Sequence, residues 1–179
     1  MACGAAIDDE VPDAPPPDAP SSTAALAFTP AQMSAAAAEC DAPHGAVERY
    51  TTVAELVALL SGAWFHCPDP AGKGVENSIH GRGSAGARQG LEFTTDGHFF
   101  WLSPDLSGTV VRGQGIREFA SYTIYPPNNV KYNNVSFQID VRYPDGSTMP
   151  TRASFETRPR RLALQNWSGF FVPISGGAS

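Results

Sequence analysis

The sequence predicts an all-β domain, an eight-stranded antiparallel up-and-down β-barrel preceded by one or two short helices. Two observations support this fold class. Beyond residue 63 the chain consists of about eight short β-prone segments joined mostly by tight turns, a spacing that favours a meander barrel over a sandwich with long crossovers. One of these segments, Val135–Tyr143, alternates apolar and polar residues with a period of two, as a strand with one solvated face does.

The chain divides into a tether, one domain and a short tail. Residues 1–28 are expected to be a disordered tether because Pro, Ala and Asp give them little to bury. The domain is expected over 29–174 and a flexible tail over 175–179. The tether carries five carboxylates and no base, so about −1 of the net charge of −6 is left for the rest. A near-neutral domain lacks the field that gathers nucleic acid or acidic substrates.

Two capping boxes mark the predicted helices. Thr29 begins a Thr-x-x-Gln box ahead of Pro30–Glu39, and Thr52 begins a Thr-x-x-Glu box ahead of Val53–Leu60. The first helix has a mostly alanine face and needs docking to be stable. The second has one apolar stripe, which suits packing across the end of a sheet.

The β-prone segments follow one another from the end of the second helix. An Asp96-Gly97 pair between two of them is a strong hairpin signal, and Pro68–Arg88 is expected to be a surface loop over an opening. In Phe99–Leu102 both strand faces are apolar, so one pair of side chains must cover something outside the barrel, most simply a helix. The predicted strands are Ala63–Cys67, Gln89–Thr94, His98–Ser103, Thr109–Arg112, Arg117–Tyr125, Val135–Tyr143, Met149–Thr157, Arg161–Trp167 and Phe170–Ile174.

The three cysteines bear on the compartment. Met1-Ala2-Cys3-Gly4 resembles the cleavage site of bacterial lipoproteins, whose cysteine becomes the lipidated first residue; a chance cysteine is the alternative. The lipoprotein interpretation implies a lipid anchor on Cys3 and a periplasmic or outer-membrane location in the bacterial envelope. In that oxidising space Cys40 and Cys67 are expected to form a disulfide, with two separate buried thiols as the alternative.

Gly62-Ala63-Trp64 follows the second helix and opens the first strand. This motif, at the start of an eight-strand meander, resembles the Gly-x-Trp signature of lipocalins and the wider calycin barrels. The resemblance covers about residues 53–174 by order of elements, but only the tripeptide by motif. It implies that Trp64 closes the barrel floor and that an arginine near the last strands, Arg160 or Arg161, covers its indole. It also implies a distant relative, closest to bacterial lipocalin-like lipoproteins.

A barrel of eight strands either fills its interior with side chains or leaves room for one small ligand, and the sequence leaves both outcomes open. An open barrel predicts a binding protein for a small apolar molecule. The alternative is a protein-interaction module, such as an inhibitor or assembly factor, with a filled core and an exposed apolar patch near Phe99–Leu102. The expected ligand-binding side chains are Phe93, Phe99, Trp101, Tyr122, Phe137 and Phe155.

An enzyme is the least favoured hypothesis. The histidines lack the i, i+2 or i, i+4 partner of a metal site on one element, and no Gly-x-Ser-x-Gly elbow occurs. We therefore predict no catalytic residue, metal or cofactor, no nucleic acid partner, and a monomer. An enzyme would need polar groups that converge inside the barrel, for instance Glu92, His98 and Tyr122.

Overall fold

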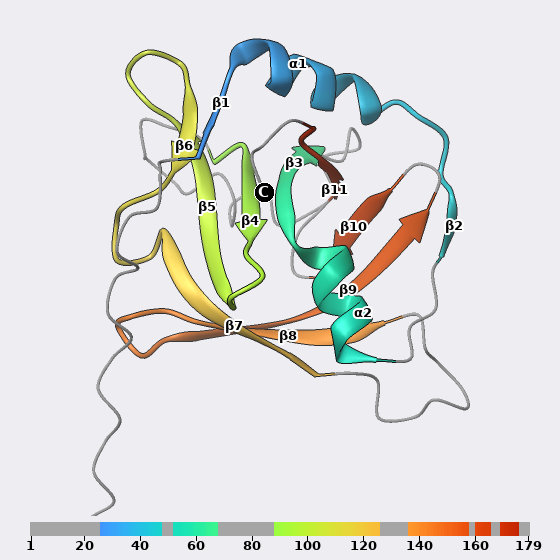
Figure 1. Cartoon of the computed structure of the whole chain (residues 1–179), viewed down its shortest axis with the longest axis vertical. Helices are drawn as coiled ribbons and strands as arrows, with labels where there is room; N and C mark the ends of the chain where they lie inside the picture. The colour runs from blue at the N-terminus through green and yellow to red at the C-terminus, as the bar shows by residue number, and fades with distance from the viewer. Residues whose placement is uncertain are drawn as a thin grey trace, which may run out of the picture.

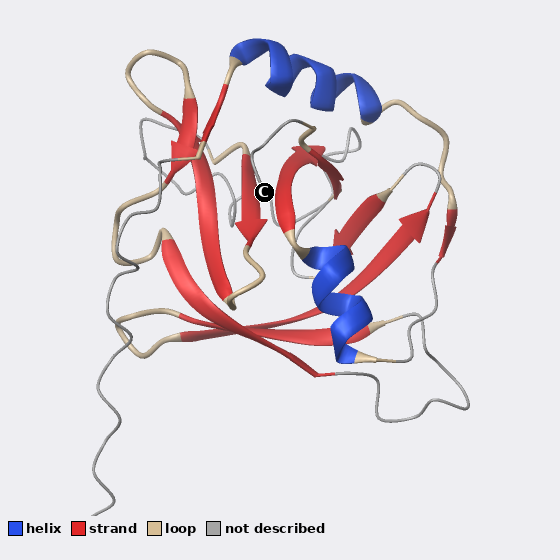
Figure 2. Ribbon diagram, in the orientation of Figure 1, coloured by secondary structure: helices blue, strands red, loops and turns tan. Residues whose placement is uncertain are grey.

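Eight antiparallel strands close into a barrel in meander order, which confirms the predicted fold class (Figures 1 and 2). The computed structural model describes residues 26–47, 52–67, 88–125, 136–157, 160–165 and 169–175. Each barrel strand pairs with the next, and the last pairs with the first to close the ring. The barrel strands are β3 (Gly62–Cys67), β4 (Gly90–Phe93), β5 (His98–Pro104), β7 (Phe119–Tyr125), β8 (Phe137–Arg142), β9 (Thr148–Thr157), β10 (Arg161–Leu164) and β11 (Phe170–Pro173).

The strand register gives the barrel a large stagger. The register can be followed from Gly62 on β3 to His98 on β5 in either direction around the ring, counting residues along β3 from Gly62 toward Cys67. Through β4, the pairings place His98 one residue before Gly62. In the other direction, through β11, β10, β9, β8 and β7, they place His98 eleven residues beyond Gly62. The difference, about 12 residues, is the shear of the barrel. At a fixed number of strands a larger shear tilts the strands more and widens the barrel, so this barrel is wider than the eight-stranded TIM barrel, whose shear is about 8.

Three short strands extend the sheet outside the ring. β5 is long enough to pair with β7 through its first half and with β6 (Val110–Arg112) through its second half. β1 (Ala27–Phe28) adds to β6, and β2 (Ala46–Val47) adds to the end of β9. The predicted strand at 109–112 is therefore real but lies outside the barrel. Phe28, the last residue of the predicted tether, belongs to β1 and is fully buried.

Both helices begin and end where the sequence predicts, and both capping boxes are formed. α1 (Pro30–Glu39) lies outside the ring against β3 and β11 (Figure 1), where Met33 and Ala36 pack with Val172 and Ile174. α2 (Val53–Leu60) lies across one end of the barrel and contributes apolar side chains to the interior core. Neither helix among the described residues is long and apolar enough to cross a bilayer.

The apolar run of β5 is covered on both sides. Phe99 and Trp101 point inward into the barrel core. On the outer face Leu102 joins the cluster beneath α1, while the guanidinium of Arg112 covers Phe100 at 4.5 Å from the ring centroid. Of the two outward side chains, α1 covers Leu102 and Arg112 of β6 covers Phe100.

A disulfide joins Cys40, just after α1, to Cys67, the last residue of β3. It fits a protein outside the cytoplasm. Several expectations lie outside the described residues: the tether through residue 25 with its Cys3, the loop over 68–87, and the tail over 176–179.

Candidate functional site

The barrel interior gathers all the side chains that we predicted to bind a ligand. The six belong to one continuous cluster of buried residues inside the ring. They come from β4, β5, β7, β8 and β9 because alternate residues of each strand point inward. The six are Phe93, Phe99, Trp101, Tyr122, Phe137 and Phe155.

Trp64 lies in the interior at the end that α2 crosses, which we call the floor end. Its indole Nε1–H donates to the carbonyl of Leu60 at 2.8 Å, which ties the ring to the last turn of α2. Gly62 allows this close turn from helix to strand, because its φ of 125° lies in the region that favours glycine. The guanidinium of Arg160 lies 5.0 Å from the Trp64 ring centroid, a distance at which a cation is attracted to an aromatic face.

Of the two candidate arginines, Arg161 lies away from the floor. Its side chain points outward, because it is one residue out of phase with the inward Leu162. The guanidinium lies 4.2 Å from the ring centroid of Phe170 and donates to the carbonyls of Cys40 and Ala42. Arg161 therefore fastens the segment after α1 to the outside of the barrel.

Aromatic rings pack closely around the floor end. Trp64 and Phe155 have centroids 5.8 Å apart, and Phe155 stacks on Phe137 at 5.5 Å. On the opposite wall Phe93 meets Tyr122 edge to face at 5.0 Å. Burial raises the pKa of Tyr122 above its usual value, and its hydroxyl donates to the carbonyl of Thr94. This end of the interior is filled by side chains in mutual contact.

A second tryptophan, Trp101, lies toward the other end, which we call the far end. β5 runs from Phe99, opposite the floor residue Phe93, to Trp101, and the ring of Trp101 meets Phe99 edge to face at 5.0 Å. Its Nε1–H donates to the hydroxyl of Tyr143 at 3.3 Å. Tyr143 follows the far end of β8, and burial raises the pKa of its phenol above the usual value.

The inner wall toward the far end is smaller and more polar than the floor. Ala120 lies opposite Phe99, and Met149 and Thr151 face inward beside Val141 and Ile139. Thr151 and His66 are both buried. His66 is inward because it follows Trp64 by two residues on β3, and its ring lies 5.0 Å from that of Phe171.

The sequence shows His66 as one of several histidines without a metal-binding partner nearby in the chain. The alternation of β3 about the inward Trp64 is the signal that would have placed it inside the barrel.

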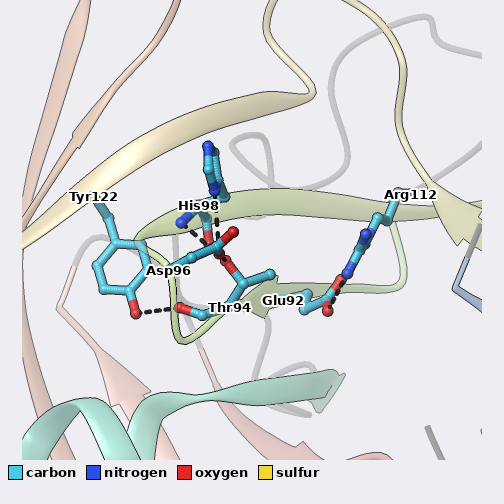
Figure 3. Close-up of polar contacts among 6 residues, drawn as sticks. All are labelled: Glu92, Thr94, Asp96, His98, Arg112 and Tyr122. Atoms are coloured by element: carbon cyan, nitrogen blue, oxygen red, sulfur yellow. Dashed lines mark hydrogen bonds and ion pairs between the residues drawn. The ribbon is translucent and has the colours of Figure 1, made fainter. Parts of the chain in front are cut away.

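The three polar residues that an enzyme would need do not converge (Figure 3). Glu92 faces outward and forms a bidentate ion pair with Arg112, at 2.7 Å for both contacts. His98 also faces outward, 3.1 Å from the carboxylate of Asp96. Only Tyr122 points inward. The convergence that an enzyme would need is not formed by this trio, because Glu92 and His98 are out of phase with the inward Phe93 and Phe99.

The described part of the chain holds no group of three or more His, Cys, Asp or Glu placed to bind a metal ion. In the comparisons with known proteins, no family model matches the chain, and neither a curated protein nor a solved structure does.

Proposed function

We propose that the barrel binds one small, mostly apolar molecule in the half of its interior away from Trp64. The observation that carries this proposal is a closed eight-stranded ring with a shear of about 12 and an apolar inner wall. No described strand points a carboxylate inward, so the described wall offers a ligand no negative charge. Pockets for small ligands are mostly apolar with a few placed polar groups.

The polar groups toward the far end narrow the ligand class. His66, Thr151 and the hydroxyl of Tyr143 are buried near apolar side chains, and the Thr151 hydroxyl already donates to the carbonyl of Arg152 at 3.3 Å. A hydroxyl with only a weak acceptor in an apolar wall favours a ligand with an apolar body and one neutral polar group, because a poorly paired polar atom is costly to bury. The Tyr143 hydroxyl suits this role, since its own contact as a donor is to the sulfur of Met149 at 3.9 Å, a weak acceptor.

We also propose that the protein is a monomeric, lipocalin-like lipoprotein of a bacterial envelope, anchored through Cys3. The Cys40–Cys67 disulfide supports an oxidising compartment. The contact of Arg160 with Trp64 at the barrel floor has the arrangement that the Gly62-Ala63-Trp64 resemblance implies. The acidic, proline-rich residues 4–28 suit a spacer between a lipid and a domain.

The main feature expected of a protein-interaction module is not found. Such a module required an exposed apolar patch near Phe99–Leu102, but these four side chains are between 0% and 6% exposed. We therefore do not propose it.

Binding of N-phenyl-1-naphthylamine, an uncharged apolar fluorophore, tests the proposal. Saturable fluorescence enhancement with one site is expected for the wild-type protein. Ala120→Leu adds volume to the inner wall and is expected to weaken binding by about 1–3 kcal/mol, the usual cost of overpacking. Thr123→Leu places the same leucine on the exposed outer face of the same strand and is the control. Absence of saturable binding by the wild type, or equal weakening by both substitutions, would contradict the proposal.

A further inference from the structure

Arg88 covers the tryptophan at the far end of the barrel. Its guanidinium carbon lies 4.5 Å from the centroid of the Trp101 ring. Glu118 holds it there through two contacts, Nη2 to Oε1 at 2.6 Å and Nε to Oε2 at 3.3 Å. Arg88 also donates to the carbonyl of Arg117 at 3.3 Å. Both side chains of the pair are only partly exposed, 19% for Arg88 and 27% for Glu118.

The loop between β6 and β7 is shaped to hold Glu118. A Cβ atom at Gly113 would lie 2.5 Å from the Cβ and 2.7 Å from Oε2 of Glu118, so only glycine fits there without displacement. The Glu118 N–H donates to the carbonyl of Gly115 at 2.7 Å. The Glu118 carbonyl in turn accepts from the N–H of Trp101 at 2.8 Å. The glycines at 113 and 115 thus position a carboxylate beside the barrel end.

We propose that the Arg88–Glu118 pair is a latch that limits how fast a ligand enters and leaves the far end of the barrel. This inference rests on the proposed function. Backbone hydrogen bonds fix Glu118 to the barrel, and its partner guanidinium stands at the end of the long Arg88 side chain. Partly exposed ion pairs are weak and are screened by salt, so the pair can open without unfolding the barrel.

The other charged groups of this end do not form the latch. Arg117 pairs with Asp145 at 2.8 Å and is largely exposed. Its side chain makes no described contact with Trp101, although both Arg88 and Arg117 act electrostatically on Tyr143. Arg117→Gln therefore matches Arg88→Gln in charge and location but leaves the latch in place.

The latch predicts a change in rates rather than in affinity. Because Arg88 and Glu118 lie outside the proposed binding region, breaking their pair lowers the barrier for uptake and release alike. In stopped-flow measurements with N-phenyl-1-naphthylamine, Arg88→Gln and Glu118→Gln are each expected to raise both rate constants about two- to fivefold. The dissociation constant should change less than about twofold, and Arg117→Gln should leave the rates unchanged.

A second measurement uses the wild-type protein alone. Raising the salt concentration screens the pair, and the probe is uncharged, so both wild-type rate constants should rise with salt while those of Arg88→Gln stay flat. Unchanged rates in both latch variants, or wild-type rates that do not respond to salt, would overturn the latch while leaving ligand binding intact. Absence of probe binding by the wild type would instead overturn the proposed function.

Discussion

The two tryptophans of the barrel interior occupy similar surroundings but have different partners. Trp64 and Trp101 are each 1% exposed, and each has a guanidinium against its ring. The Trp64 N–H donates to a helix carbonyl at 2.8 Å, whereas the Trp101 N–H donates to the hydroxyl of Tyr143 at 3.3 Å. A carbonyl in a helix moves only with the helix, but a side chain can change rotamer. We infer a fixed floor and a far end that can rearrange.

The arginines that cover the two indoles, Arg160 at the floor and Arg88 at the far end, also have different surroundings. Both arginines are partly exposed, but the Nε and Nη2 atoms of Arg160 are buried at the floor. The guanidinium of Arg88 is instead paired with a partly exposed carboxylate. Removing a buried group leaves an unfilled space or an unpaired atom, whereas separating an exposed pair exchanges its contacts for water. Substitutions at the floor should therefore change stability, and those at the far end should change kinetics.

The largest expected effect is at the floor. Trp64→Ala removes a fully buried indole and its link to α2, and should lower the free energy of unfolding by about 3–5 kcal/mol. Trp64→Phe keeps most of the ring but leaves the Leu60 carbonyl unpaired, which costs about 1–3 kcal/mol. Trp101→Phe should cost less than Trp64→Phe, because the Tyr143 hydroxyl can rotate to another partner. Urea unfolding measures all three.

Equal losses for Trp64→Phe and Trp101→Phe would remove the distinction between a fixed floor and a movable far end. Circular dichroism of each folded variant before the denaturant series serves as the control for a native starting state.

The disulfide provides the next largest effect. Cys40 and Cys67 are 27 residues apart, so replacing both by serine should destabilise the protein by about 3–4 kcal/mol in the chain-entropy account. Cys67 lies at the end of β3 away from the floor. Amide hydrogen exchange in the variant should therefore increase more at His66 than at Trp64, which lies beside the helix anchor.

Uniform acceleration of exchange along β3 would show that the bridge stabilises only the whole fold, and would contradict a floor that holds independently. Wild-type protein without reductant is the reference for both amides.

Local sequence signals predicted most of the fold. The capping boxes at Thr29 and Thr52 specify the helix starts from adjacent residues, and the Asp96-Gly97 turn specifies a hairpin whose glycine has a φ of 88°. Alternation placed the aromatic side chains inside the ring. These signals were sufficient because each depends on residues within a few positions of one another.

The far end could not be predicted because its contacts join distant residues. Arg88 and Glu118 are thirty positions apart, and only the closed ring brings the start of β4 beside the loop before β7. The role of Gly113 depends on where the Glu118 side chain lies, and no neighbouring residue indicates that. The sequence also left open which of the neighbouring Arg160 and Arg161 faces the indole, because the choice depends on the phase of the strand that follows.

The smallest expected effect concerns Tyr143 at alkaline pH. Burial raises the pKa of its phenol above the usual value of about 10, so the folded state binds this proton more tightly than the unfolded state. The resulting stability is fully present below pH 10 and is lost as the pH rises through the folded-state pKa. Tyr143→Phe should weaken this alkaline loss, measured as the change in urea midpoint between neutral and alkaline pH.

Tyr122→Phe is the matched comparison, since burial also raises the pKa of Tyr122 but its hydroxyl donates to the Thr94 carbonyl at 2.7 Å. If the far end rearranges more easily, the ionised Tyr143 can reach water, so N-phenyl-1-naphthylamine should exchange faster at alkaline pH in the wild type and not in Tyr143→Phe. Tyr122→Phe should retain the wild-type acceleration. If the alkaline acceleration of probe exchange depends on Tyr122 and not on Tyr143, the movable end is the floor. That result would contradict the fixed floor inferred from the hydrogen bonds of Trp64 and Trp101.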